Sequence, residues 1–183
     1  MLVIISGPSG VGKDSIARGV IGEIPWLEIS RSWTTRPPRP TETDESYNFV
    51  SREEFLKAVA QDRFLEWAEY LGNLYGTPIP HEDDSAILVI EVLGALQVKA
   101  LRPEAVWIII VPPNLDELAR RIKDRGTETP EQQAARLEGG KDEVRIAINS
   151  RLVDRAVIND DLALAIGQVT RYILGRVAAS GLT

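Results

Sequence analysis

The stretch that decides the fold is LVIISGPSGVGKDS, residues 2–15. Its first five residues are apolar or small, which is typical of a buried strand. The pattern Gly7-x-x-x-x-Gly12-Lys13 follows at once. In such a loop backbone N–H groups surround a polyphosphate, the lysine reaches the outer phosphates, and the next helix adds its positive N-terminal end. The stretch therefore predicts a strand, a phosphate-binding loop and a helix, which together make a nucleotide site.

One position of this loop departs from the usual pattern. The residue after the lysine, where a Ser or Thr hydroxyl normally meets Mg²⁺, is Asp14. Two interpretations stay open. Asp14 is a metal-site carboxylate, or it is an acid at a helix N-terminus that the helix dipole favours.

The composition limits the class of protein. The chain has 183 residues, a net charge of −6, 44% hydrophobic residues, no cysteine and a single histidine, His81. This length predicts one domain. Disulfides, thiolate chemistry and a histidine metal site are not expected. An acidic chain without a leader-like N-terminus or a long apolar run predicts a soluble, cytoplasmic protein that binds neither nucleic acid nor membrane.

Strand and helix patterns alternate along the chain. Alternating residues predict a strand over 27–33, apolar runs predict buried strands over 86–92 and 106–111, and a last short strand is expected over 155–158. Helices are expected over 14–24 and 94–101, after Asn114, from Thr129-Pro130 toward residue 150, and after Asp161. The order predicts an α/β fold with a mainly parallel sheet flanked by helices.

A different pattern separates the first strands from residue 86. Residues 34–43 are rich in proline, with Arg36 and Arg39 among them, and predict an extended basic connection. Ser51 and Glu54 form a capping-box pattern before a helix, and residues 64–70 and 74–77 read as a hairpin around a Gly-Asn turn. Residues 34–80 are therefore expected to form a small mixed unit. Farther on, a Gly139-Gly140 pair predicts a weak point or hinge inside a helix.

Several motifs occur in order: SWTTRPPR at 32–39, YNFVS at 47–51, FLEWA at 64–68, GNLYGT at 72–77 and NDD at 159–161. With these motifs the chain resembles guanylate kinases over nearly its whole length. The resemblance implies a P-loop kinase core (residues 1–33, 86–120 and 146–183), a small mixed α/β insert that binds GMP (34–80) and a helical lid (121–145). It also implies transfer of the γ-phosphoryl group of ATP to GMP, with ATP and GMP as substrates and Mg²⁺ bound with ATP.

The resemblance also assigns roles to single residues. It implies that the GMP phosphate is held by two arginines and two tyrosines, that the guanine base is read by Glu66 with help from two hydroxyls, and that the lid arginines stabilise the transition state. The implied GMP contacts are Ser32, Arg36, Arg39, Tyr47, Glu66, Tyr75, Thr77 and Glu91. The implied ATP contacts are Gly7, Pro8, Ser9, Gly10, Val11, Gly12, Lys13, Asp14, Ser15, Arg121 and Asn159, and the implied catalytic residues are Lys13, Arg36, Arg125 and Arg136.

The chemistry of these residue types fits the implied reaction. Phosphoryl transfer needs positioning and charge stabilisation more than a covalent catalyst, so a phosphate loop with several arginines is suitable. A carboxylate at Glu66 matches the adjacent N1–H and amino donors of guanine, and adenine lacks this pair. Each of these residues also has an alternative, structural interpretation. The arginines could be solvated or ion-paired, Glu66 could lie at the surface, the tyrosines could pack in strands, and Asn159 could cap a helix.

The chain departs from the family at its metal site. Where guanylate kinases usually have an aspartate near Mg²⁺ the chain has Val89, and where they have a second aspartate it has Glu91. Together with Asp14, these changes suggest that the metal-site carboxylate has moved from the strand end to the loop.

Two other functions remain open. The Lys13-Asp14 step and the missing strand-end aspartate also resemble ribose 1,5-bisphosphate phosphokinases, and guanylate-kinase-like scaffold modules bind phosphopeptides without catalysis. Glu66, Tyr47, Tyr75 and Thr77 favour GMP over a sugar phosphate, and Lys13 favours catalysis. The oligomeric state is left open.

Overall fold

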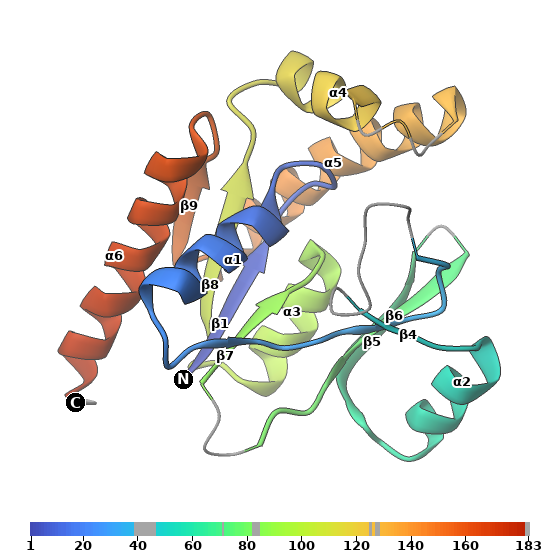
Figure 1. The fold of residues 1–183 in the computed structure, drawn as a ribbon, viewed down its shortest axis with the longest axis horizontal. Coiled ribbons are helices and arrows are strands. Elements are labelled where there is room, and N and C mark those ends of the chain that lie inside the picture. The colour runs from blue at the N-terminus through green and yellow to red at the C-terminus, as the bar shows by residue number, and fades with distance from the viewer. Residues whose placement is uncertain (39–46, 71, 82–84, 125, 127–128, 182–183) are drawn as a thin grey trace.

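The computed structural model describes residues 1–38, 47–70, 72–81, 85–124, 126 and 129–181, and its centre is one parallel sheet (Figure 1). Within the described residues this sheet has five strands in the order β2-β7-β1-β8-β9. Each neighbouring pair runs parallel. The α/β class with a mainly parallel sheet is confirmed. The strands are β1 (Leu2–Ser6), β2 (Glu28–Ile29), β7 (Ala86–Val89), β8 (Val106–Val111) and β9 (Arg155–Ile158).

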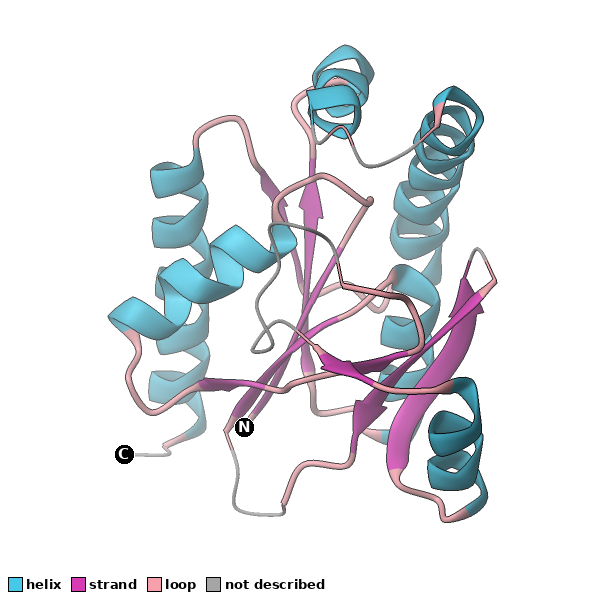
Figure 2. Cartoon of the chain, turned by 45° about the vertical axis from the view of Figure 1, so that its right-hand side comes forward, coloured by secondary structure: helices cyan, strands magenta, loops and turns pink. Residues whose placement is uncertain are grey.

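Helices cover both faces of this sheet (Figure 2). Helices α1 (Lys13–Glu23) and α6 (Leu162–Ser180) pack on one face, and α3 (Val92–Leu101) and α5 (Pro130–Ser150) pack on the other. Side chains of a strand alternate between its faces. Val3 and Ile5 therefore enter the core under α1 and α6, while Ile4 enters the core under α3. Both faces are buried, which explains the continuous apolar runs of β1 and β8.

A second, smaller sheet forms the unit between β2 and β7. Its strands are β3 (Trp33–Thr34), β4 (Asn48–Phe49), β5 (Phe64–Tyr70) and β6 (Asn73–Pro78), in the order β4-β3-β6-β5. The expected hairpin of β5 and β6 is confirmed, and Gly72 has a φ of +78° at its turn. Helix α2 (Arg52–Ala60) begins with both arms of the Ser51–Glu54 capping box and places Phe55 against Phe64, with ring centroids 4.6 Å apart.

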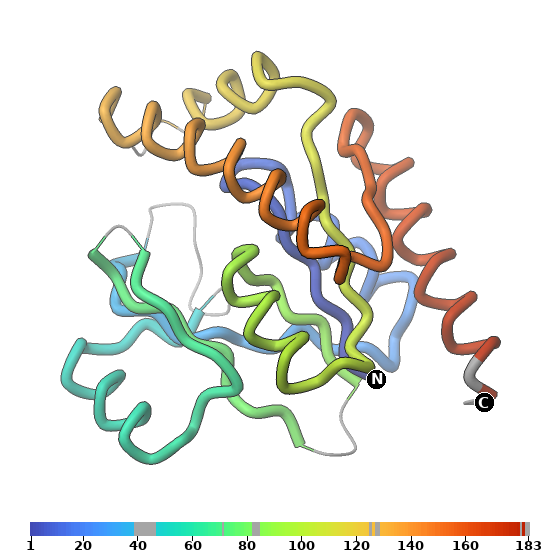
Figure 3. The backbone as a smooth tube through the Cα atoms, turned by 180° about the vertical axis from the view of Figure 1, so that it is seen from behind, coloured from blue at the N-terminus to red at the C-terminus, as the bar shows by residue number. Residues whose placement is uncertain are grey.

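Helix α4 (Leu115–Asp124) lies beside α5, and both helices extend on the same side of the main sheet as the small sheet (Figures 1 and 3). The expected caps are present. Asn114 Oδ1 accepts from the Glu117 amide at 2.8 Å, and Thr129 forms a capping box at the start of α5. Among the described residues, no helix combines the length and the apolar character needed to cross a membrane.

Two sequence-based expectations are wrong in extent. The predicted strand over 27–33 is two short strands: β2 pairs with β7 in the main sheet, whereas β3 pairs with β6 in the small one. The apolar run 86–92 leaves its strand at Val89, and Val92 already begins α3. In both cases the side-chain pattern identifies an apolar or extended segment. It does not identify the strand with which that segment pairs, because strand pairing depends on tertiary structure.

Helix α5 is continuous through Gly139 and Gly140 and through residue 145, so the glycine pair lies inside a helix as expected, and its role as a hinge stays a prediction. A Cβ built on Gly140 would lie 3.0 Å from the Cβ of Pro8. The absence of a side chain at Gly140 therefore permits close contact between α5 and the phosphate loop.

Candidate nucleotide-binding site

The carboxyl ends of the parallel strands bring the expected site residues together. The phosphate loop (residues 7–13) follows β1, Glu91 lies two residues beyond β7, and Asn159 follows β9. Because these strands are parallel, their carboxyl ends share one edge of the sheet, which is where α/β proteins bind ligands. The placement of the loop at this edge agrees with the sequence analysis.

The backbone of the phosphate loop requires glycine. Gly12 has a φ of +99°, and a Cβ there would lie 2.5 Å from Asn159 Nδ2. Gly7 has a φ of +140°, and a Cβ there would collide with the Ile110 carbonyl oxygen at 2.1 Å. Side chains other than hydrogen are excluded at both positions by conformation and by space. The loop is thus shaped by its neighbours on β8 and after β9 as well as by its own sequence.

Lys13 is buried and already paired. Its Nζ donates to the carbonyl oxygens of Gly7 and Pro8 and lies 3.2 and 3.3 Å from the two carboxylate oxygens of Glu91. A buried ammonium needs such partners, because an unpaired buried charge is costly. Nucleotide phosphates would therefore have to share Lys13 with Glu91 or replace Glu91.

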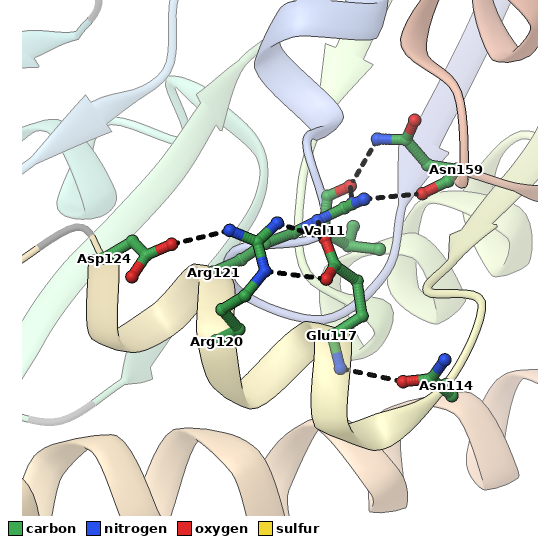
Figure 4. A network of polar contacts seen from close by, with 7 residues as sticks. All are labelled: Val11, Asn114, Glu117, Arg120, Arg121, Asp124 and Asn159. Carbon is green, nitrogen blue, oxygen red and sulfur yellow. Dashed lines mark hydrogen bonds and ion pairs between the residues drawn. The ribbon is translucent and has the colours of Figure 1, made fainter.

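A polar network fixes the loop from α4 and from the residue after β9 (Figure 4). Arg121 donates to the carbonyl oxygens of Val11 at 3.4 Å and Asn159 at 3.0 Å, while the Asn159 side chain donates to Val11 O at 2.8 Å. Hydrogen bonds from Arg120 and Arg121 lower the pKa of Glu117 to about 2, so this carboxylate stays ionised and orients Arg121. Both proposed ATP contacts, Arg121 and Asn159, thus bond to the loop backbone.

The alternative capping role belongs to another residue of the NDD motif. Asp161 is the N-cap of α6, and its Oδ1 accepts from the Leu164 amide at 2.9 Å. Asn159 is buried and is turned toward the phosphate loop. The structure therefore separates the two interpretations that the motif left open.

A cleft of about 540 Å³ joins the phosphate loop to the small sheet. Most of the residues expected to bind nucleotides line it, from both sheets. They are Pro8, Ser9, Gly10, Gly12, Lys13, Asp14, Ser15, Ser32, Arg36, Tyr47, Glu66, Tyr75, Glu91 and Arg136. Other expected residues do not line the cleft, and hydrogen bonds connect them to lining residues or to one another. They are Gly7, Val11, Thr77, Arg121 and Asn159. Arg39 and Arg125 lie outside the described residues.

At one end of the cleft Glu66 is buried and oriented. The Thr77 hydroxyl donates to Glu66 Oε1 at 2.6 Å, and both side chains are buried. Burial raises the pKa of Glu66, while the hydrogen bonds of Thr77 act in the opposite direction. Ser32 is also buried along this lining. A surface position for Glu66 is therefore wrong, and the site offers carboxylate oxygens to a donor pair.

Nearby, Arg36 lies among aromatic rings of the small sheet. Its guanidinium carbon is 5.6 Å from the Tyr47 ring centroid and 5.7 Å from that of Phe49, and Nη1 donates to the Pro37 carbonyl at 2.7 Å. The Tyr47 and Tyr75 rings are in edge contact at 6.4 Å. Burial, with the charges of Asp14 and Glu91, raises the pKa of Tyr47 far above its ordinary value. Its hydroxyl thus remains a hydrogen-bond donor at neutral pH.

From α5, Arg136 reaches the same cleft. It is buried, its Nη1 donates to Ser9 Oγ at 2.7 Å, and its guanidinium carbon is 5.8 Å from the Tyr70 ring centroid. Helix α5 thus delivers a positive charge directly to the phosphate loop. The role of Arg136 as a lid arginine beside ATP phosphates stays a prediction.

The metal ligands of the site are sparse. Asp14 is exposed in the cleft lining beside Val89, which has no oxygen ligand, and Glu91 is engaged by Lys13. Within the described part of the chain, no three His, Cys, Asp or Glu side chains gather as a metal site. Mg²⁺ commonly uses one or two carboxylates together with substrate phosphates and waters, so the single carboxylate of Asp14 is a sufficient protein donor for such a site.

Two residues with a clear place in the site were missed by the sequence analysis. A Cβ on Gly94 would lie 2.8 Å from Glu66 Oε2, so Gly94 leaves room for the carboxylate. Glu143 on α5 lies within hydrogen-bonding reach of Glu91. Both contacts join distant parts of the chain, and no local signal marks Gly94. The Arg136, Gly140 and Glu143 spacing along one helix face is a signal that could have drawn attention to Glu143.

A parallel sheet with a phosphate loop at its carboxyl edge, completed by a small sheet that closes the cleft, defines the class of phosphate-loop kinases. The comparison with known sequences is more specific: the model of the family described as guanylate kinase matches residues 1–175. The chain belongs to the guanylate kinase family.

Individual relatives agree with this assignment. A guanylate kinase from Symbiobacterium thermophilum is 40% identical over 185 residues, covering 97% of this chain and 86% of the relative. One from Gloeobacter violaceus is 44% identical over 183 residues, covering 96% and 88%. The crystal structure of guanylate kinase from Anaplasma phagocytophilum superimposes with a TM-score of 0.76 at 28% identity, covering 96% of this chain and 85% of that one.

Proposed function

We propose that this chain transfers the γ-phosphoryl group of ATP to GMP, giving ADP and GDP, and that it accepts dGMP as well. The observation that carries the proposal is the position of Glu66. A buried carboxylate, oriented by Thr77 and given space by Gly94, lines the same cleft as Lys13. Guanine offers N1–H and an amino group side by side, so one carboxylate accepts both, whereas adenine would leave buried acceptors unpaired.

The rest of the small sheet is suited to the monophosphate. Arg36 supplies a guanidinium, and Tyr47 and Tyr75 supply hydroxyl donors on the same side of the cleft. We assign residues 34–80, including Arg39, to GMP binding. An arginine and two tyrosine hydroxyls suit a phosphate dianion, because charge-assisted hydrogen bonds are stronger than neutral ones.

The opposite side of the cleft is suited to the ATP phosphates. The loop amides, Lys13 and Arg136 converge there, with Arg121 and Asn159 holding the loop. In this arrangement an oxygen of the GMP phosphate attacks the γ-phosphorus in line as the bond to ADP breaks. Lys13, Arg136 and Arg125 balance the charge on the transferred group, which is the main catalytic requirement of phosphoryl transfer. We assign residues 121–145 to the lid.

We further propose that Asp14 holds Mg²⁺ together with the ATP phosphates and replaces the carboxylate that Val89 cannot supply. The exposed position of Asp14 in the cleft and the absence of an oxygen at Val89 support this assignment. A bound Mg²⁺ would neutralise phosphate charge and orient the β- and γ-phosphates. Without the metal, Asp14 repels these phosphates, so we expect poor affinity for free ATP.

One coupled assay tests the proposed function. ADP production is measured with Mg·ATP and either GMP, dGMP, AMP or ribose 1,5-bisphosphate as acceptor. We expect turnover with GMP and dGMP and little with AMP. Absence of turnover with GMP would overturn the proposal, and selective turnover with the sugar phosphate would identify a sugar-phosphate kinase instead. Binding of GMP without any ADP production would indicate a non-catalytic module.

A further inference from the structure

Helix α5 meets the phosphate loop along one face. Arg136, Gly140 and Glu143 are spaced at i, i+4 and i+7, which places them on one side of a helix. Arg136 bonds to Ser9, and Gly140 packs on Pro8. Glu143 is the next residue on this face, and the proposed transfer of phosphate from ATP gives it no role.

The contact of Glu143 is unusual because its partner is also an acid. The Glu143 side chain lies within hydrogen-bonding reach of Glu91, and Glu91 in turn accepts from Lys13 Nζ at 3.2 Å. Two ionised carboxylates have no donor between them, so one must carry a proton. As a carboxylate, Glu143 would also leave its buried Oε2 without a hydrogen-bond partner in the part of the chain that the structure describes. A proton on Oε2 that is donated to Glu91 removes both penalties.

The surroundings of Glu143 favour the protonated form. Burial raises the pKa of Glu143 to about 8, and the charge of Glu91 adds to the effect, while Lys13 and Arg136 act in the opposite direction. Tyr70 on β5 is the other titratable group affected by this pair. Burial, together with Glu91 and Glu143, raises the pKa of Tyr70 to about 12, so its phenol stays neutral where the pair titrates.

We propose that Glu143 is a positioning residue of this enzyme: it shares one proton with Glu91, and the pair ties helix α5 to the ammonium of Lys13, which holds the helix and the phosphate loop in place for ATP. Glu143 acts through Glu91 and does not contact substrate. The inference rests on the proposed kinase function, and it adds a hydrogen-bonded link between the lid helix and the loop.

The shared proton makes this link dependent on pH. With one proton, the pair carries a single negative charge, which Lys13 balances. Because the pKa of Glu143 is higher here than in an unfolded chain, the link stabilises the site at low pH and is lost as the pH rises through about 8. Above that pH two negative charges are in contact. We therefore expect kcat/KM for ATP to fall roughly tenfold for each further pH unit, since this parameter follows ionisations of the free enzyme.

The test compares three variants over pH 6 to about 9.5, a range that spans this ionisation. E143A removes the link and should raise KM for ATP at pH 7. E143Q places an amide donor on Glu91 without a proton to lose, so it should rescue the defect of E143A at pH 7. At pH 9 E143Q should exceed the wild type in kcat/KM for ATP by roughly tenfold. The control is E138Q, an exposed glutamate of the same helix that pairs with Lys141, and it should follow the wild-type profile.

A second measurement does not depend on turnover. Infrared spectra of the free enzyme at pH 7 should contain the carbonyl band of a protonated carboxylic acid, which disappears in E143Q and is lost in the wild type as the pH passes about 8. Identical pH profiles for wild type and E143Q, or absence of the acid band, would overturn the proposal. Absence of kinase activity at every pH, with the band present, would instead overturn the proposed function.

Discussion

The end of the cleft that we assign to guanine (the guanine end) and the end that we assign to the phosphates (the phosphate end) are organised in opposite ways. At the guanine end, a hydrogen bond from Thr77 holds one carboxylate oxygen of Glu66. The other oxygen faces Gly94. At the end that we assign to the phosphates, the cations are held by oxygens of the protein itself. Lys13 pairs with Glu91, and Arg136 bonds to Ser9.

The difference teaches how the two ends contribute to function. If Glu66 recognises guanine as proposed, it can do so without losing its hydrogen bond to Thr77, so the protein would be organised for base discrimination before the substrate binds. The cations must share or exchange partners when phosphates bind. Changes at the phosphate end should therefore affect every acceptor equally, and changes at the guanine end should alter the choice of acceptor.

The largest effect is expected from Lys13→Met. The variant removes the ammonium from the phosphate end and leaves Glu91 without its cation. We expect kcat to fall by roughly 10³ with GMP and with any slower acceptor alike, because loss of one preorganised charge donor costs about 10² to 10³ in rate. Lys57→Met, an exposed change on α2, is the control and should retain activity. A Lys13→Met enzyme that lost GMP but kept another acceptor would contradict the division between the ends.

The next largest effect is expected from Glu66→Gln, and it should be selective. An amide presents one acceptor and one donor to guanine, so kcat/KM for GMP should fall by about 10², while the low activity with AMP is unchanged or rises. The control is Glu53→Gln on the exposed side of α2. An equal loss of kcat/KM with GMP and with AMP would show that Glu66 does not discriminate between the bases.

The same variant also tests the burial of Glu66. Because burial raises its pKa, ionisation of Glu66 opposes folding, and the stability of the wild type falls as the pH rises above the ordinary pKa of a glutamate. Glu66→Gln has no such charge. Its melting temperature should exceed that of the wild type more at pH 7.5 than at pH 4.5, as measured by thermal denaturation. A constant difference would indicate that the carboxylate is not desolvated.

A smaller effect is expected from Gly94→Ala. The added Cβ would lie 2.8 Å from Glu66 Oε2, so the carboxylate must shift away from its guanine-reading position. We expect KM for GMP to rise by roughly tenfold, within the cost of small misplacements in active sites, with little change in KM for ATP. Gly22→Ala on α1 is the matched control, because its Cβ would meet no atom within 4 Å. A rise in KM for ATP without a rise in KM for GMP would contradict the assignment of Gly94 to the guanine end.

The sequence predicted the phosphate end better than the guanine end, for a physical reason. The loop lies in one contiguous stretch whose glycines and lysine act through their own backbone, and the strands over 106–111 and 155–158 were predicted to the residue. The guanine reader depends on contacts between β5, β6 and α3, which are far apart in the chain. The resemblance to guanylate kinases pointed to Glu66 and Thr77, but the role of Gly94 required the structure.

Local patterns also failed where one stretch serves two elements. The alternation over 27–33 belongs to two sheets, and Gly140 in α5 permits close packing against Pro8, a contact that the sequence did not indicate. A side-chain pattern reports burial and spacing, and it does not identify the partner. For the same reason the charge of Glu143 could not be inferred, because its proton depends on Glu91, a residue 52 positions away in the chain.

The smallest effect, and the sharpest test of the phosphate end, is expected from Asp14→Ser. If Asp14 is the metal carboxylate, the variant gains the usual hydroxyl of the loop but loses the charge that Val89 cannot replace. The Mg²⁺ concentration required for half-maximal turnover should rise roughly tenfold, the lower range seen when metal sites lose a supporting group. Asp116→Ser is the control, since Asp116 is an exposed acid in the first turn of α4 and shares only the interaction with a helix dipole. If both variants lose only stability, by similar amounts, Asp14 is a helix-terminal acid; if turnover and metal affinity rise, the metal carboxylate has not moved to the loop.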